Sequence, residues 1–273
     1  MKFRYFLAVC APLLPVLSPL VAEPCNHATD IAGQARTELR KAITSNDKAA
    51  IQHVLQAYPQ YYNDFIQQGL CEAAECKNAS LVLFFLGEGA QINGTYPLGE
   101  GALINGAYIG WTALHYAVKA GSIACVECLL AQGADINAQT WWCKATPLFI
   151  AIENHHIDLV KLLISRGAQL DVHSYWLHYN VLHQAVSSND APILEYLLSA
   201  GADLINDRDY TKETPIMLAA RYNKPELVKL LALYHPIFTA DDMAQVKEAW
   251  EKTTGGHTRE TIRALLLGLL SSK

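Results

Sequence analysis

The order of apolar and polar residues predicts short amphipathic helices that come in pairs. In the segment 157–164, Ile157, Val160 and Ile164 are separated by three and four positions, which places them on one face of a helix. Another short apolar segment precedes this one, and the pair recurs along the chain with a step of 34 residues. A fixed step of this size is typical of repeat proteins, in which each unit packs only on its neighbours. The pattern therefore predicts an all-α solenoid.

Five stretches share this frame without a gap inside the repeat unit. The clearest covers residues 110–137, and the next, 145–171, keeps its register. Later copies begin around Asn180 and Thr214, and an upstream copy covers residues 68–93. The chain resembles the ankyrin repeat, whose signature is T-P-L-H-x-A. The resemblance is carried by Thr-Ala-Leu-His at 112–115, Thr-Pro-Leu-Phe at 146–149 and Gly-Ala-Asp-Ile-Asn at 133–137. The resemblance covers nearly all of the chain after residue 36, and it implies helix–turn–helix repeats joined by β-hairpin fingers.

Weaker repeats at the two ends are expected to close the stack. Residues 37–62 contain two short apolar segments and predict a degenerate N-terminal cap, while 65–234 contain the five repeats. After Tyr234 the signature stops, and residues 239–271 predict two helices that form a C-terminal cap. Residues 23–36 are expected to be a polar leader.

Polar and small residues mark the ends of the predicted helices. Threonines at 112, 146 and 214 are placed to cap the first helix of a repeat. That helix ends at Gly121, Asn189 or Asn223 in three copies, and these residue types tolerate a left-handed backbone. His155 occupies the same position in another copy, so we expect a different turn there.

The first residues have the features of a secretory signal peptide. Lys2 and Arg4 precede an apolar run that ends near Leu20, and the small residue Ala22 precedes the first acid. Prolines interrupt the run, which argues against a membrane-spanning helix. Cleavage after Ala22 would leave a mature chain without a membrane anchor, and its net charge would be −7 instead of −5 because two basic residues are lost. An acidic chain binds phosphates poorly, which argues against a nucleic-acid partner.

The link between the first two full repeats contains a tandem duplication. The sequence GEGAQINGTYPL at 87–98 is followed at once by GEGALINGAYIG at 99–110, and eight of the twelve positions match. The duplication predicts an extended finger at 93–110, in which Asn-Gly pairs favour a hairpin.

Tyrosine and tryptophan recur in the predicted fingers at the 34-residue step. A row of such rings on projecting loops has the composition of a protein-binding hot spot. The alternative is that each ring packs on the neighbouring finger and stiffens the row. One register column contains Tyr108, Trp142, Trp176 and Tyr210, the preceding column contains Trp141 and Tyr175, and Tyr96 lies in the duplicated finger.

The first helix of each repeat offers a second candidate binding surface. Equivalent positions near its end carry different polar residues from one repeat to the next, as a concave face adapted to one partner would need. A solvated surface is an equally good interpretation. The candidate binding residues on this face are Lys119, Glu153, Asn154, Arg221 and Tyr222.

The histidines and one cysteine pair are better explained by the fold than by catalysis. His115 and His183 occupy the histidine position of the signature, where the resemblance implies hydrogen bonds that tie repeats together. Cys125 and Cys128 form a C-x-x-C motif, but both fall in apolar register columns, and no second such pair completes a zinc site. A metal site would have to involve His155, its neighbouring histidine and the cysteines. No nucleophile elbow, phosphate loop or carboxylate pair is present, so we expect neither an enzyme nor a cofactor.

Six cysteines would remain after signal cleavage, an even number that permits disulfides in an exported protein. Their pairing does not follow from the sequence. The expected disulfide formers are those outside the apolar columns of the second helices, namely Cys25, Cys71, Cys76 and Cys143.

Together these features predict a non-catalytic, protein-binding scaffold in the bacterial periplasm. Its layout is similar to that of immunity proteins that neutralise toxic effectors delivered by rival cells, such as a type VI secretion lipase. The resemblance implies that the extended finger and the concave face would enter the effector's active-site cleft. The alternative is a protective or assembly factor that binds and stabilises an exported enzyme.

Overall fold

The structure, a computed structural model, describes residues 27–95, 110–141, 143–175, 177–201, 203–251 and 257–271. Within these residues the chain forms short α-helices joined by turns, with one isolated bridge between Thr95 and Thr112. The predicted all-α solenoid is therefore confirmed. The signal peptide expected at 1–22 lies outside the described residues.

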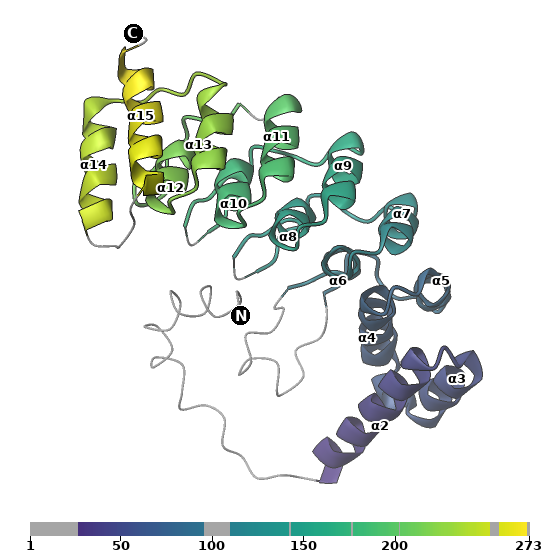
Figure 1. The fold of residues 1–273 in the computed structure, drawn as a ribbon. Helices are drawn as coiled ribbons and strands as arrows, with labels where there is room; N and C mark the ends of the chain where they lie inside the picture. The colour runs from purple at the N-terminus through teal and green to yellow at the C-terminus, as the bar shows by residue number, and fades with distance from the viewer. Residues whose placement is uncertain are drawn as a thin grey trace.

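The helices stack as pairs in a curved row (Figure 1). Each inner helix packs on the outer helix of its own repeat and on the inner helix of the next, so that one buried core follows the axis of the stack. The inner helices are α4 (Tyr62–Glu75), α6 (Ala113–Ala120), α8 (Pro147–Glu153), α10 (Val181–Ser187) and α12 (Pro215–Arg221). The outer helices are α5 (Ala79–Gly87), α7 (Ile123–Ala131), α9 (Ile157–Ser165), α11 (Ala191–Ser199) and α13 (Pro225–Ala232).

A helix pair closes the N-terminal end of the stack. It consists of α2 (His27–Thr44), which packs on α4, and α3 (Lys48–Ala57), which leads through the 3-10 turn η2 (Pro59–Tyr61) into α4. Because α2 begins at His27, residues 27–36 are helical, and the expectation of a polar leader is wrong for this part. The buried side chains of Ala35 and Leu39 lie on one face of α2. Their packing stabilises a helix that its otherwise polar sequence would not predict.

A second pair closes the C-terminal end. It consists of α14 (Ala240–Glu251), which packs on α12, and α15 (His257–Ser271), which packs on α13. The indole N–H of Trp250 donates a hydrogen bond of 2.9 Å to the carbonyl of Ala220, in the last turn of α12. The two helices thus continue the inner and outer rows of the repeats and cover their last apolar faces (Figure 1).

Each inner helix is connected to its outer helix by a tight turn with one residue in the left-handed region. The residues at this position are Lys77, Gly121, His155, Asn189 and Asn223, with φ between 56° and 77°. His155 therefore adopts the same turn as the others, and the different turn expected there is wrong. Its Nδ1 lies 2.8 Å from the carboxylate of Asp190 in the next repeat, a contact that offsets a backbone strain of about 1 kcal/mol.

The starts of the inner helices depart in part from the expected threonine caps. In α6 the hydroxyl of Thr112 lies 2.9 Å from Nδ1 of His115, and the Thr112 backbone N–H donates to the same nitrogen at 3.1 Å. In α8 and α12 the hydroxyls of Thr146 and Thr214 are buried without a hydrogen-bond partner. The residue three positions further on is histidine in α6 but apolar in these two helices, so it offers the hydroxyl no polar atom.

The links between repeats are closed turns, and none of their described residues belongs to a strand apart from the bridge at Thr95. In the link after α7, the backbone N–H of Thr140 donates to the carbonyl of Ala145 at 3.0 Å. A turn this short reverses the chain but is too short to form a ladder of paired strands. The β-hairpin fingers expected between repeats are therefore present as turns.

A close helix contact in the first repeat gives a test of the packing. Gly69 of α4 faces the ring of Phe85 on α5, and a Cβ at this position would lie 2.3 Å from that ring, which is fully buried. Gly69→Ala is therefore expected to lower the free energy of unfolding by about 1–3 kcal/mol, as measured by urea denaturation. Gly33→Ala in α2, where nothing lies within 4 Å, is the matched control and should be neutral or slightly stabilising. Equal stability of the two variants would contradict this packing.

Candidate functional site

Three consecutive links fold into the same kind of turn. In each, the side-chain oxygen of the first residue accepts a hydrogen bond from the backbone N–H of the last, and the first backbone N–H donates to the last carbonyl in return. The side-chain bonds join Thr140 to Ala145 at 3.0 Å, Ser174 to Tyr179 at 3.0 Å and Asp209 to Glu213 at 2.9 Å. Because both ends of each turn are fixed in this way, the residues between them have a defined position before any partner arrives.

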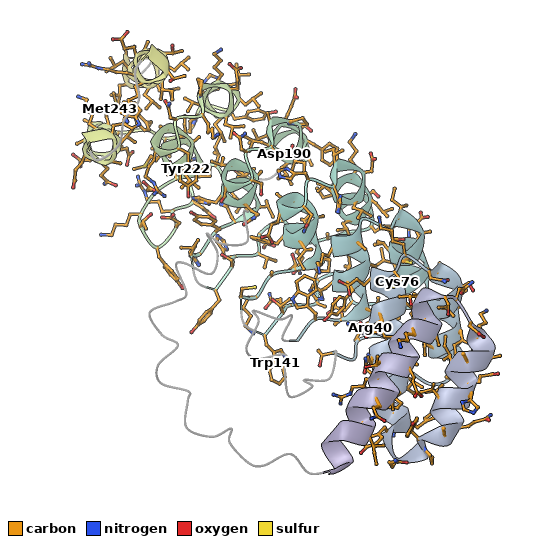
Figure 2. All side chains as sticks on the ribbon, turned by 60° about the horizontal axis from the view of Figure 1, so that its bottom comes forward. Arg40, Cys76, Trp141, Asp190, Tyr222 and Met243 are labelled. Carbon is orange, nitrogen blue, oxygen red and sulfur yellow. The ribbon has the colours of Figure 1, made fainter. Side chains whose placement is uncertain are left out.

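The second residue of each turn is an exposed aromatic. Trp141, Tyr175 and Tyr210 are 70%, 57% and 64% exposed, and we call these three residues the aromatic row. Figure 2 shows Trp141 projecting from its link, away from the helices. The third turn, 209–213, is one residue shorter than 140–145, which shifts its register. Counted from the first residue of its turn, Tyr210 is equivalent to Trp141 and Tyr175. Counted from the left-handed residue near the end of the turn, it keeps the 34-residue step that grouped it with residues 142 and 176.

Backbone hydrogen bonds join neighbouring turns of the row. The N–H of Tyr175 donates to the carbonyl of Cys143 at 2.9 Å, and the N–H of Tyr210 donates to the carbonyl of Leu177 at 3.2 Å. At the first turn, Trp141 lies so close to Gly110 that a Cβ on residue 110 would be 2.5 Å from its ring. The turns are thus stiffened by main-chain contacts, and the three aromatic side chains stay largely exposed.

The last but one residue of each turn carries a basic side chain in the left-handed region. Lys144, His178 and Lys212 have φ values of 56°, 54° and 63°. This conformation costs an L-residue about 1 kcal/mol, which glycine would not incur. The ring of His178 stacks on Tyr210 of the next turn with centroids 5.1 Å apart, while both lysines are exposed.

The candidate residues on the inner helices differ in how far they are already engaged. Lys119 of α6 forms an ion pair of 3.0 Å with Glu75 of α4, and the side-chain amide of Asn154 donates to the carbonyl of Ile150 in its own helix. Glu153, at the end of α8, is exposed, and desolvation by the surrounding protein raises its pKa. The surroundings of Glu153 therefore stabilise its carboxylate less than water would.

Arg221 and Tyr222, at the end of α12, are connected to the third turn. The guanidinium of Arg221 lies 4.9 Å from the ring centroid of Tyr222 and 2.9 Å from the carboxylate of Glu213, the last residue of that turn. Burial, together with the nearby Tyr222, raises the pKa of the Tyr179 phenol, which therefore stays neutral. This cluster connects the aromatic row to the inner-helix face, and Figure 2 shows Tyr222 beside α12.

A family model described as ankyrin repeats, three copies, matches residues 39–140, 70–174, 137–209 and 172–245. The matches together cover most of the chain. The protein belongs to the ankyrin-repeat family. Ankyrin repeats mediate protein–protein interactions, so the chain is a protein-binding scaffold. No curated protein matches the chain.

Several candidate residues cannot be placed on the ankyrin scaffold. The extended finger predicted at 93–110 is described only up to Thr95 and from Gly110 onwards. Its part in binding therefore stays a prediction from the sequence. The predicted contact residues Tyr96, Tyr108, Trp142 and Trp176 all lie outside the described residues.

The two signature histidines make the contacts that the ankyrin resemblance implied. His115 is fully buried, and its Nε2–H donates to the carbonyl of Ala138, 3.1 Å away in the link to the next repeat. His183 is also fully buried, with Nε2 3.0 Å from the carbonyl of Glu213. Burial lowers the pKa of both rings, that of His115 to about 4, so both are neutral at pH 7.

The disulfides expected among Cys71, Cys76 and Cys143 are absent, because all the described cysteines are free thiols. Cys71 is buried inside the first repeat, where burial raises the pKa of its thiol, Cys76 is exposed at the end of α4, and Cys143 lies in a link. Cys71 and Cys76 lie within and at the end of the same helix, α4, and Cys143 lies two repeats away in a link. Cys25, the fourth expected disulfide former, lies outside the described residues.

The histidine pair considered for metal binding is used in contacts between repeats. His155 pairs with Asp190, and Nε2–H of His156 donates to the carbonyl of Lys119 at 3.2 Å. No group of three or more His, Cys, Asp or Glu side chains in the described ranges is arranged to hold a metal ion. In the same ranges, no helix combines the length and the apolar character needed to cross a bilayer.

Proposed function

We propose that this ankyrin-repeat protein is a non-catalytic immunity protein of the periplasm, which binds a toxic effector such as a type VI secretion lipase and neutralises it. The aromatic row is the observation that carries the binding part of this proposal. Its side chains are large and exposed on turns whose ends are fixed by hydrogen bonds. Docking of a partner would therefore cost these turns little conformational entropy. Trp and Tyr in such positions contribute most of the energy at many protein interfaces.

The inner-helix face supports a binding surface wider than the row. Arg221 and Tyr222 adjoin the third turn through Glu213, so one partner could contact both the tips and the concave side. Exposed Glu153, with its raised pKa, would gain from a partner that supplies a hydrogen-bond donor. These contacts would give specificity, while the row would give most of the affinity.

The periplasmic and immunity parts of the proposal rest on the sequence. Residues 1–22 have the charge, apolar run and small residue of a signal peptide, and the lengthened finger at 93–110 is the kind of projection that could fill an enzyme's cleft. Blocking a cleft requires no chemistry from the blocking protein, which is consistent with a scaffold that lacks a recognisable catalytic motif.

Capture of the partner is the first half of the test. The mature chain, residues 23–273, is used as bait in periplasmic extracts, beside a bait in which Trp141, Tyr175 and Tyr210 are alanine. A protein retained by the first bait and lost from the second is the candidate partner. If every retained protein is held equally by both baits, the aromatic row is not the binding surface.

Growth then decides between immunity and the alternative. Cells that export the captured protein alone are expected to stop growing, and co-export of the mature chain, but not of the alanine variant, is expected to restore growth. The measurement is the viable count after induction. A captured protein that is harmless alone, and whose activity rises with the chain, would instead support the protective or assembly factor.

A further inference from the structure

We infer that the aromatic row binds an acidic segment of the partner protein, with Lys144 and Lys212 pairing with its carboxylates. This inference rests on the proposed function, because it names the chemistry of the partner at the same surface. It does not depend on the partner being a toxin.

The turns present positive charge outward on a chain whose net charge is −5. Lys144 and Lys212 are exposed, and neither ammonium group has an acidic partner in the part of the chain that the structure describes. The acids of the third turn point into the fold. Asp209 is buried, its Oδ1 accepts backbone N–H groups of its own turn and its Oδ2 has no hydrogen-bond partner, and Glu213 pairs with Arg221. An acidic segment would therefore meet two unpaired cations beside the rings.

The backbone at these lysines is left-handed, a conformation that glycine adopts at the equivalent position before the first turn. The equivalent residue before the first turn of the row is Gly110, with φ of 75°, and glycine adopts this conformation without strain. The following turns keep the conformation but replace glycine by Lys144, His178 and Lys212. His178 has an internal contact, its stack on Tyr210. The two lysines have no such contact among the described residues, so their ammonium groups are available to an acidic partner.

An acidic protein segment fits these observations better than a nucleic acid. Strong phosphate binding needs many cations along a track, and here two lysines alternate with rings on an acidic molecule. The alternation of rings and cations suits a polypeptide in which carboxylates are interspersed with apolar side chains. Membership of the ankyrin-repeat family likewise indicates a protein partner.

A defined acidic polypeptide tests the inference without knowledge of the natural partner. The probe is a random copolymer of glutamate and tyrosine, and its binding to the mature chain is measured by fluorescence anisotropy at increasing salt. We expect binding that weakens with salt, because exposed ion pairs are screened. Lys144→Gly with Lys212→Gly should weaken binding by about tenfold and flatten the salt dependence.

The choice of glycine separates binding from folding. Because glycine relieves the left-handed strain, the double variant should have a Tm no lower than that of the parent. Lys77→Gly is the matched control. Lys77 is exposed with φ of 61°, but it lies in the turn between α4 and α5, at the opposite end of the helices from the links. This control variant also removes a lysine side chain from a left-handed backbone position. It should bind the copolymer with the affinity of the parent.

Several results would overturn the inference: no binding of the copolymer, parental affinity in the double variant, an equal loss in Lys77→Gly, or tighter binding of single-stranded oligothymidylate than of the copolymer. Any of these would leave the proposed function standing if the captured partner still requires the aromatic row. If the alanine variant of the row also retains that partner, the proposed function itself fails.

Discussion

Simultaneous replacement of Trp141, Tyr175 and Tyr210 by alanine is expected to weaken binding of the captured partner by roughly a thousandfold, or about 4 kcal/mol. The side chains are largely exposed in the free protein, so their removal costs the fold little beyond the stack of His178 on Tyr210 and the contact of Trp141 with Gly110. In a complex they would be buried. The two backbone bonds between neighbouring turns do not involve these side chains and should survive the change. Isothermal titration calorimetry measures the affinity, and urea denaturation measures the stability.

A matched control uses exposed apolar residues on the opposite side of the stack. Leu83 and Ile123 lie on outer helices, Leu267 lies on α15, and they are 50%, 44% and 45% exposed. Their triple alanine variant loses a similar kind of surface away from the row and should bind with parental affinity. Equal weakening in both triple variants would mean that loss of apolar surface in general, and not the row, explains the effect.

Acidification is expected to destabilise the protein through its buried histidines. The folded-state pKa of His115 is about 4, against about 6.5 for an exposed histidine. Between these two pH values the unfolded chain binds a proton that the folded protein excludes. His115 therefore contributes stability that is fully present above pH 6.5 and is lost as the pH falls towards 4, by about 3 kcal/mol in total. Urea denaturation at a series of pH values measures this loss.

The variant His115→Gln isolates the contribution of this ring. Glutamine retains an acceptor for the Thr112 backbone N–H in the manner of a capping box, but it does not titrate. His183 adds a loss of the same sign in both proteins, while the raised pKa values of Glu153 and Glu213 act in the opposite direction. The stability difference between parent and variant should therefore shrink on going from pH 7 to pH 4. A difference that stays constant would show that His115 does not titrate in this range.

The sequence was sufficient to predict the solenoid, because the apolar positions that define its period are the positions that the core buries. The apolar residues Leu114, Leu148, Leu182 and Ile216 lie at the same position of the inner helix in successive repeats, and all four are buried. The contacts of His115 and His183 between repeats were also predicted, because both residues occupy the histidine position of the repeat signature. The extent of α2 was missed because its polar composition conceals a narrow buried face around Leu39.

The details of the links could be predicted only in part, because side-chain oxygens determine where each turn begins. Asp209 closes a shorter turn than Thr140 or Ser174, so the fixed step does not show that Tyr210 is the second residue of its turn. The same applies at His155, where the contact of Nδ1 with the Asp190 carboxylate supports a conformation that the residue type disfavours. The His155–Asp190 contact joins residues of different repeats, so a motif that covers a single repeat cannot predict it.

Hydrogen–deuterium exchange of the mature chain, free and bound to its captured partner, locates the binding surface. Binding is expected to protect the turns at 140–145, 174–179 and 209–213 and the ends of α8 and α12, and to leave the exchange of α7, α9 and α11 unchanged. Protection confined to those outer helices, with unchanged exchange in the three turns, would contradict this expectation.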